Sequence, residues 1–192
     1  RSGGAQDARL MVTVLSGQQG KGRTYVLPSK EDNIAIEKAR LTVLEHKAKY
    51  KNAYPSQQMP NSASGYFAPP LYGAKTFSDL FNSRQLIFAS WIIESFERWV
   101  LEKSFTVGEK EAIRACVGLA ISRLIDSNSA QCWWVTVHGE TVMRTFGRQA
   151  YPMVWDFAEV NPFADSSRGI NNAVETIART LELNYFGDTI ND

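Results

Sequence analysis

The segment Thr145-Phe-Gly-Arg-Gln-Ala-Tyr-Pro-Met-Val-Trp-Asp-Phe-Ala-Glu-Val-Asn-Pro-Phe163 combines large aromatic rings with many hydrogen-bonding side chains. A core element rarely carries so many polar groups, because each one that is buried without a partner costs roughly 1–3 kcal/mol. A plain surface loop has no need of so many rings. The segment is therefore predicted to lie at the boundary of the hydrophobic core, with its rings packed on the core and its polar side chains in contact with another domain or a ligand.

The composition of the whole chain is that of an ordinary globular protein. Of its 192 residues, 44% are hydrophobic and 21% are charged, and the formal net charge is +1. This length predicts one domain, with or without a flexible arm. The net charge argues against a strongly basic nucleic-acid clamp but leaves room for a local basic patch. The most apolar run, 86–96, is well short of the roughly 20 residues that span a bilayer, so we expect no contact with membranes.

The cysteines and histidines do not predict a metal site. Cys116 and Cys132 form no CxxC pair, and the two histidines, His46 and His138, lie far apart in the sequence. A structural zinc ion needs four such ligands, so we expect no metal in this chain. Two isolated cysteines are typical of a reduced, cytoplasmic protein.

Apolar residues at helical spacing predict two long helices before the segment. The first begins after an N-cap at Thr76, with a carboxylate at Asp79. It is apolar on most sides, which predicts a central, buried helix. The second helix runs from Glu109 to about Asp126 and has one apolar face.

The regions on either side of the segment carry weaker patterns. Residues 133–138 predict a short strand or an ordered loop, followed by Gly139 and a short helix that reaches Phe146. After the segment, residues 171–183 predict a closing helix. Its inward face is expected to hold Val174, Ile177, Ala178 and Leu181.

The N-terminal region predicts a hairpin followed by a helix. Two short runs rich in β-branched or apolar residues, 9–15 and 25–27, flank a glycine-rich loop. A phosphate-binding loop is not expected there, since no Lys-Ser/Thr pair follows the glycines. Ser29 is then the expected N-cap of a helix, because Asp32 follows at the position of a capping box.

Together these patterns predict a mainly α protein with a small N-terminal β-hairpin. The chain divides into a disordered end (1–8), a hairpin plus helix (9–50), an irregular linker (51–75), a helical core (76–186) and a tail (187–192). The linker assignment rests on four prolines and the absence of any apolar period.

Four blocks of the sequence resemble one protein family in the same order. They are YVLP at 25–28, a YGxxTxxDLFxxRQL pattern at 72–86, an RLxDxNSxxCxW pattern at 123–134, and the segment 145–163 itself. This chain resembles the large adenine-specific DNA methylases that carry an N-terminal domain of unknown function and, usually, an internal zinc ribbon. The resemblance covers most of residues 9–163.

The resemblance implies an irregular helical domain inserted in an α/β methyltransferase. The parent enzyme would transfer a methyl group from S-adenosylmethionine to adenine N6. The family's cofactor loop, roughly DPFxGxGxxxxE, has no counterpart in this chain, and Asn161-Pro162-Phe163 lacks the second proline of the amino-methylating loop. We therefore expect no catalytic residue, no bound cofactor and no zinc ribbon here, and a turn or capping role for Asn161. The expected partners are the rest of the methyltransferase and DNA.

Six side chains join this resemblance to a physical reason for contact with nucleic acid: Arg84, Gln85, Arg123, Trp134, Arg148 and Gln149. Guanidinium and amide groups beside apolar surface can make bidentate contacts to phosphates or base edges. The alternative for the arginines is internal pairing with Asp79, Asp126, Asp156 or Glu159, of which Asp156 and Glu159 would share a helix face.

For the pair Arg148 and Gln149 we expect burial against the helices that carry Arg84 and Arg123. Asp156 or Asp126 would supply the countercharge. Replacing Arg148 by alanine would then strand a carboxylate and destabilise the domain by roughly 3–5 kcal/mol.

A second function fits the same residues. The chain could be a protein-interaction module in a DNA-modification or phage-defence complex, such as a restriction-modification system, with its aromatic surface as the interface. The near-neutral net charge favours this alternative. Many exposed aromatic rings without a basic stripe on the same face would decide for it.

Overall fold

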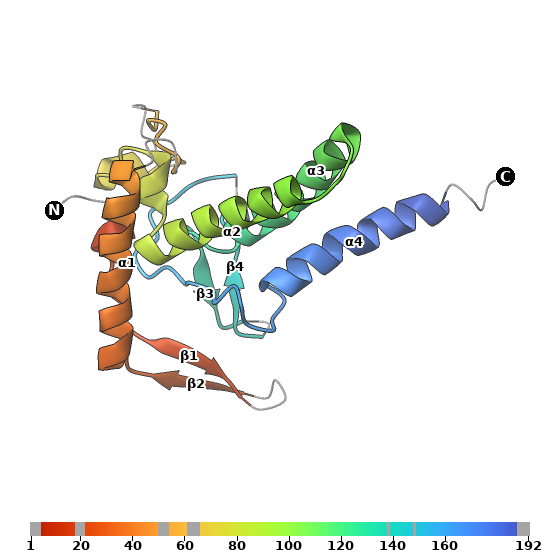
Figure 1. Cartoon of the computed structure of the whole chain (residues 1–192). Coiled ribbons are helices and arrows are strands. Elements are labelled where there is room, and N and C mark those ends of the chain that lie inside the picture. Colours follow the sequence, from red (N-terminus) through yellow and green to blue (C-terminus); the bar gives the residue numbers. More distant parts are fainter. Residues whose placement is uncertain are drawn as a thin grey trace.

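The computed structural model describes residues 5–17, 22–49, 54–60, 66–137, 139–147 and 149–187. Within these ranges the chain is mainly helical. The four α-helices are α1 (Lys30–Lys49), α2 (Ser83–Glu102), α3 (Val107–Asp126) and α4 (Ile170–Gly187) (Figure 1). Three short 3-10 helices cover Ala5–Asp7, Pro69–Tyr72 and Phe77–Leu80. The predicted fold class is thereby confirmed at the level of mainly α with a small N-terminal hairpin.

The predicted N-terminal hairpin is present. Strands β1 (Thr13–Ser16) and β2 (Arg23–Val26) pair antiparallel, with Thr13 opposite Val26. α1 begins where the capping box predicts. The Ser29 hydroxyl accepts a hydrogen bond from the Asp32 amide at 3.0 Å, and the Asp32 carboxylate accepts one from the Ser29 amide at 2.8 Å.

The start of the central helix differs from the prediction. Thr76 and Asp79 do form a capping box, but it caps the 3-10 helix Phe77–Leu80. The backbone is then extended at Phe81, and α2 begins at Ser83 with Asn82 as its N-cap. A second capping box makes this possible, because Asn82 and Gln85 exchange hydrogen bonds of 2.9 and 3.0 Å.

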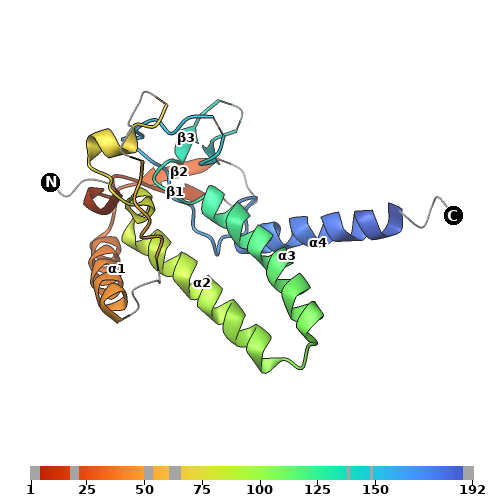
Figure 2. The same cartoon turned by 90° about the horizontal axis from the view of Figure 1, so that it is seen from above.

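α2 is not buried on most sides, contrary to the prediction. Leu86 and Val100 are almost fully buried, but Trp91 is 50% and Leu101 68% exposed. Figure 2 shows the reason: α2 and α3 form an antiparallel hairpin whose connection lies at a tip that projects from the rest of the chain. Only part of each helix therefore meets a third element.

In the part of the chain that the structure describes, the hydrophobic core consists of three small clusters rather than one large one. The first joins α2, α3 and α4 through Phe88, Ala120, Leu124 and Ala173, with Ile92, Ile170 and Ile177 packed around them. The second joins α1 to α2 through Val43, Tyr54 and Leu86. The third joins Met59 and Ala74 of the linker to Leu80 of the 3-10 helix that precedes α2. Each cluster fixes one junction between elements.

α4 buries less of its surface than the sequence predicts. Ile177 packs on the first cluster, whereas Val174 and Leu181, also expected to face inward, are 53% and 51% exposed. Figure 1 shows α4 leading away from the other elements toward the C-terminus. The apolar pattern of this helix is real, but α3 covers only its first turns.

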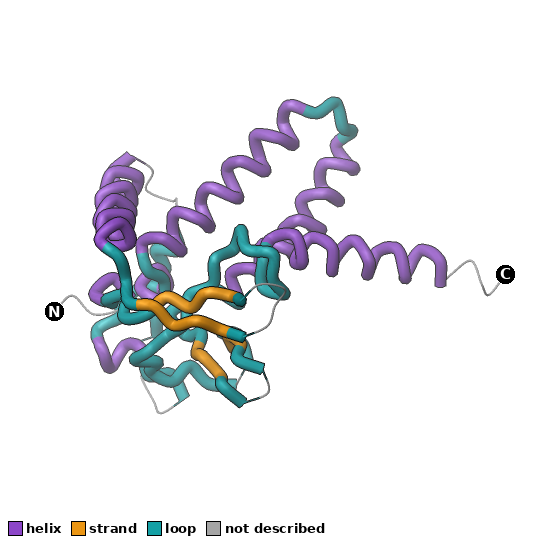
Figure 3. The backbone as a smooth tube through the Cα atoms, turned by 90° about the horizontal axis from the view of Figure 1, so that it is seen from below, coloured by secondary structure: helices purple, strands orange, loops and turns teal. Residues whose placement is uncertain are grey.

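A second hairpin replaces the expected short helix before Phe146. Strand β3 (Trp133–Val135) pairs antiparallel with β4 (Thr141–Met143), so that Trp134 lies opposite Val142. The β-branched Thr141 and Val142 favour a strand, and Gly139 takes the positive φ of 110° in the turn. Figure 3 shows both hairpins among the loops, away from the α2–α3 tip. Among the described residues, no helix combines the length and apolarity needed to cross a membrane.

Candidate nucleic-acid interface

The segment 145–163 is irregular and lies between several other parts of the chain. Tyr151 is its main anchor: its amide donates to the Tyr66 carbonyl at 2.7 Å, and its carbonyl accepts from the Ala68 amide at 2.9 Å. Farther along, the Ala158 amide donates to the Cys132 carbonyl at 2.9 Å. The segment thus joins the linker to the β3–β4 hairpin.

Arg84 forms an ion pair with this segment. Its Nε donates to Glu159 Oε1 at 2.9 Å, and its second nitrogen donates to Oε2. Both side chains are about one-third exposed or less, at 32% and 24%. Internal pairing, the alternative considered for the arginines, is therefore the arrangement found for Arg84. The expected helix face shared by Asp156 and Glu159 is absent, because the backbone here forms bends and extended stretches.

Gln85 lies inside the chain, at 2% exposure. Its Oε1 accepts from the Asn82 amide, and its Nε2 donates to Asn128 Oδ1 at 3.2 Å. Asn82 in turn donates to Glu159 Oε2 at 2.7 Å. Asn82, Gln85, Asn128, Glu159 and Arg84 form one hydrogen-bonded unit, which we call the amide framework.

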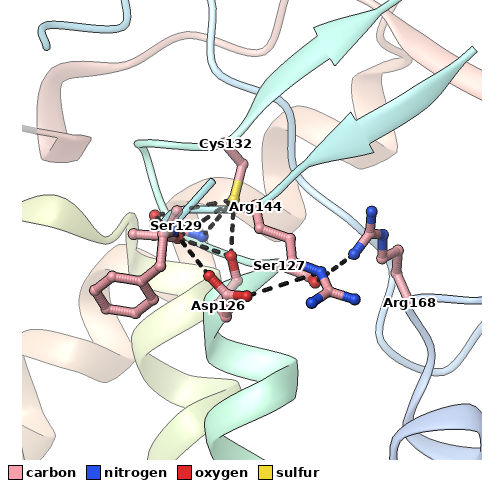
Figure 4. A network of polar contacts seen from close by, with 8 residues as sticks. Asp126, Ser127, Ser129, Cys132, Arg144 and Arg168 are labelled. Carbon is pink, nitrogen blue, oxygen red and sulfur yellow. Dashed lines mark hydrogen bonds and ion pairs between the residues drawn. The ribbon is translucent and has the colours of Figure 1, made fainter. Parts of the chain in front are cut away.

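Asp126 forms a second polar centre at the end of α3 (Figure 4). Its carboxylate accepts from the Phe146 amide at 2.9 Å, and its carbonyl accepts from the Thr145 amide and hydroxyl at 2.7 and 2.8 Å. The Ser129 hydroxyl is 2.8 Å from that of Thr145, and both lie near the sulfur of the buried Cys132. These contacts hold the start of segment 145–163 against the end of α3.

Arg123 and Trp134 are less involved in internal contacts. Arg123 lies in the last turn of α3, is half-exposed, and makes no hydrogen bond or ion pair with any residue the structure describes. Trp134 lies in β3 and is half-buried. Its buried indole nitrogen interacts with the hydroxyl group of Tyr25 in β2.

The expected burial of Arg148 and Gln149 can be compared with the structure for Gln149 alone. Arg148 lies outside the described residues, so its burial stays a prediction. Gln149 is exposed, and the expectation that it is buried is wrong. It lies in a bend just before Tyr151, and it is the Tyr151 ring that packs inward, edge-on to Phe67 at 5.9 Å. Asp126, one of the two expected countercharges, instead serves the Phe146 amide and Arg144.

Asn161 has the turn role that the sequence predicts. Its Oδ1 accepts a hydrogen bond from the Phe163 amide at 3.0 Å, and its carbonyl accepts one from the Ala164 amide at 3.1 Å. Both bonds are local and stabilise the turn that leads toward α4. In the described part of the chain, no group of His, Cys, Asp and Glu side chains is arranged to hold a metal ion.

Two arginines that the sequence did not single out lie beside Asp126. Arg144 follows β4, and its Nε is 3.8 Å from Asp126 Oδ2. Arg168 precedes α4, and one of its terminal nitrogens donates to the Ser127 hydroxyl at 3.5 Å. Burial lowers the pKa of Arg168, and the positive charges of Arg144 and Arg123 lower it further. No local signal marked these residues, because only the fold brings 123, 144 and 168 together.

Exposed aromatic rings accompany these polar centres. Tyr66 is 77%, Trp155 73% and Phe146 67% exposed. Trp155 meets the ring of Tyr72 edge-on at 5.1 Å, and Phe146 meets that of Tyr151 at 5.9 Å. Surface rings of this kind can stack on nucleobases or bury against another protein.

Comparison with models of known protein families, with curated proteins and with solved structures finds no match to this chain. The resemblance to the adenine-specific methylases therefore stays a prediction from the sequence blocks. The geometry itself offers guanidinium groups that can bind anions, amide groups used internally, and uncovered aromatic surface.

Proposed function

We propose that this chain is a non-catalytic segment of an S-adenosylmethionine-dependent DNA adenine N6-methyltransferase, in which it braces the catalytic domain and holds DNA. The starting point is the resemblance of its sequence blocks to those enzymes. One observation supports the bracing role in particular: side chains from three of the blocks meet in the amide framework. Asn82 and Gln85 come from the first of these blocks, Asn128 from the second and Glu159 from the third.

A framework of this kind fixes the relative positions of the elements that carry it. Each of its buried groups would lose roughly 1–3 kcal/mol if its partner moved away. Gln85 is bonded on both sides of its amide, so neither α2 nor the turn after α3 can shift without breaking such a bond. The polar residues of the sequence blocks thus hold the elements of this chain in fixed relative positions. A segment that braces a catalytic domain needs this rigidity.

The DNA-holding role depends on groups that stay at the surface. Arg123 is half-exposed and unpaired within the described residues, and Gln149 is exposed. A guanidinium group in this situation can pair with a backbone phosphate without losing an internal contact.

Fluorescence anisotropy of a labelled DNA duplex, titrated with the chain at several salt concentrations, tests the DNA-holding role. We expect binding whose log K falls linearly with log salt concentration, because phosphate contacts release counterions. A folded chain that leaves the anisotropy unchanged at low salt would overturn this role. Bracing is tested separately, by adding the chain to the catalytic domain of the parent enzyme. The rate of methyl transfer to DNA should then rise, and an unchanged rate would remove the bracing role.

The alternative is a protein-interaction module in a DNA-modification or phage-defence complex. The exposed rings of Tyr66, Phe146 and Trp155 favour it, because surface rings are enriched at protein interfaces. One face of α1, on which Ile34 and Leu41 are exposed, adds to the uncovered apolar surface. Failure to bind DNA, together with stoichiometric complex formation with the catalytic domain, would select this alternative.

A further inference from the structure

We propose that Arg123, Arg144 and Arg168 together bind one phosphate group. They come from three elements: the last turn of α3, the residue after β4 and the loop before α4. Arg123, Ser127 and Arg168 surround the same recess in the surface, and Arg144 joins them through Asp126, the residue before Ser127. The recess itself has no free volume, so the anion would lie over its rim, where the three arginine residues are partly exposed. Figure 4 shows two of them, Arg144 and Arg168, beside Asp126 and Ser127.

The charge around this rim is not balanced by the described residues. Three guanidinium groups face one carboxylate, Asp126. That carboxylate already accepts the Phe146 amide, and its distance of 3.8 Å from Arg144 Nε is longer than a hydrogen bond. Gathering like charges is unfavourable unless an anion neutralises them. A phosphate would supply the missing negative charge.

Arg168 provides a second, independent observation. Its Nε is buried and has no hydrogen-bond partner in the part of the chain that the structure describes. Its only side-chain hydrogen bond in the described structure is the long one, 3.5 Å, to the Ser127 hydroxyl. A buried N–H of a charged group is expected to be satisfied. An anion over the rim can reach this Nε only if the Arg168 side chain turns outward, which costs the long bond to the Ser127 hydroxyl. Phosphate oxygens then accept hydrogen bonds from guanidinium groups in pairs and fit this fork of donors better than a chloride ion does.

The shared chemistry has two sources, a phosphate of the DNA backbone or a free phosphate. The DNA source rests on the proposed function, and the site itself does not. This distinction sets the design of the test, which needs one titration for each source.

The test compares the wild-type chain with two variants, Arg123→Gln and Arg144→Gln, and one control, Arg114→Gln. Arg114 is paired with Glu97 on the α2–α3 hairpin at 2.8 Å and does not belong to the rim. Arg123 has no internal partner among the described residues, so its variant should fold normally. Thermal denaturation of each variant establishes that it is folded before any titration.

The first titration uses inorganic phosphate, with sodium chloride at matched ionic strength as reference, and follows the Nε–Hε NMR signals of the arginines. We expect saturable shifts in the wild type and in Arg114→Gln, and a loss of roughly tenfold or more in phosphate affinity in the other two variants. The second titration uses the labelled duplex at several salt concentrations. We expect each rim variant to lower the slope of log K against log salt by about one unit, and the control to leave it unchanged.

The outcomes separate the two proposals. If the wild type binds DNA and both rim variants bind it with the same affinity and slope, and phosphate produces no saturable shift, the phosphate site is wrong and the DNA-holding role stands. If phosphate binds at the rim but no duplex binds, the site stands with free phosphate as its ligand and the DNA-holding role fails. If neither ligand binds the folded wild type, both proposals fail.

Discussion

Arg84 and Glu159 lie 75 positions apart in the sequence and meet through two parallel hydrogen bonds in a half-buried environment. Arg114 and Glu97 form a similar fork on the α2–α3 hairpin but are more exposed. The same pair of chemical groups therefore occurs at two depths in one molecule. Since solvent screens an exposed ion pair and weakens it, the two forks should differ in what they contribute to stability.

Replacing Arg84 by alanine is expected to lower the free energy of unfolding by roughly 1.5–3 kcal/mol, because it leaves the Glu159 carboxylate partly buried and short of its cation. Urea denaturation followed by tryptophan fluorescence measures this loss. Arg114→Ala is the matched control and should have a clearly smaller effect. Equal losses in the two variants would show that burial does not set the strength of the Arg84 pair.

At the scale of elements, capping boxes decide where helices begin. Thr106 and Glu109 cap α3: the Glu109 carboxylate accepts from the Thr106 amide at 2.7 Å and from its hydroxyl at 2.8 Å. The backbone hydrogen bond from Thr106 is the main reason that the pKa of Glu109 lies below its ordinary value of 4.5. A carboxyl group with a lowered pKa in the folded state stabilises the fold above its unfolded pKa.

That contribution is expected to disappear as the pH falls below 4.5 and through the lowered pKa of the folded state, because protonation weakens the carboxylate as an acceptor. The variant Glu109→Gln keeps an acceptor for the Thr106 amide but does not titrate. Between about pH 6 and about pH 3, urea denaturation should show a larger loss of stability in the wild type than in Glu109→Gln. Parallel pH profiles for the two proteins would contradict this assignment.

At the scale of the whole molecule, the long helices contact one another through small clusters of buried side chains. α4 is attached to α3 mainly through the first cluster, where Ala173 is 2% exposed between the helices. The next residue, Val174, is 53% exposed. Ala173 thus faces the contact with α3, whereas its neighbour Val174 faces solvent. The two positions form a matched pair for testing how α4 is held against α3.

Ala173→Leu is expected to lower stability by about 1–3 kcal/mol, since the added isopropyl group has no room between α3 and α4. Val174→Leu should change stability by less than about 0.5 kcal/mol. Denaturation gives both values, and limited proteolysis should cut α4 faster in Ala173→Leu alone. Similar behaviour of the two variants would mean that α4 is not docked through Ala173.

The whole chain is also expected to bind neither S-adenosylmethionine nor zinc. The sequence lacks the glycine-rich cofactor loop, and its two cysteines and two histidines are too scattered to supply four zinc ligands. Calorimetry with the cofactor should show no saturable heat, and elemental analysis should find no stoichiometric metal. Either signal would contradict the interpretation of this chain as non-catalytic or metal-free.

The sequence by itself determined the features that depend on neighbouring residues. The hairpin before Pro28, the cap at Ser29, the end of α3 at Asp126 and the turn at Asn161 are all where the sequence predicts them. Each rests on hydrogen bonds or apolar spacing within a few residues, so no distant contact is needed to form it.

Only the tertiary structure decided the features that depend on distant partners. α2 begins at Ser83 because of its local capping box at Asn82 and Gln85, but the bond from Gln85 to Asn128, 43 positions away, is tertiary and joins α2 to the turn after α3. β4 forms instead of a helix because β3 is available to pair with it. The choice of Glu159 as the partner of Arg84, and the meeting of three arginines around Ser127, follow from the same cause. Charge pairing in a folded chain is set by which side chains the packing brings within a few ångströms, and no local pattern encodes that distance.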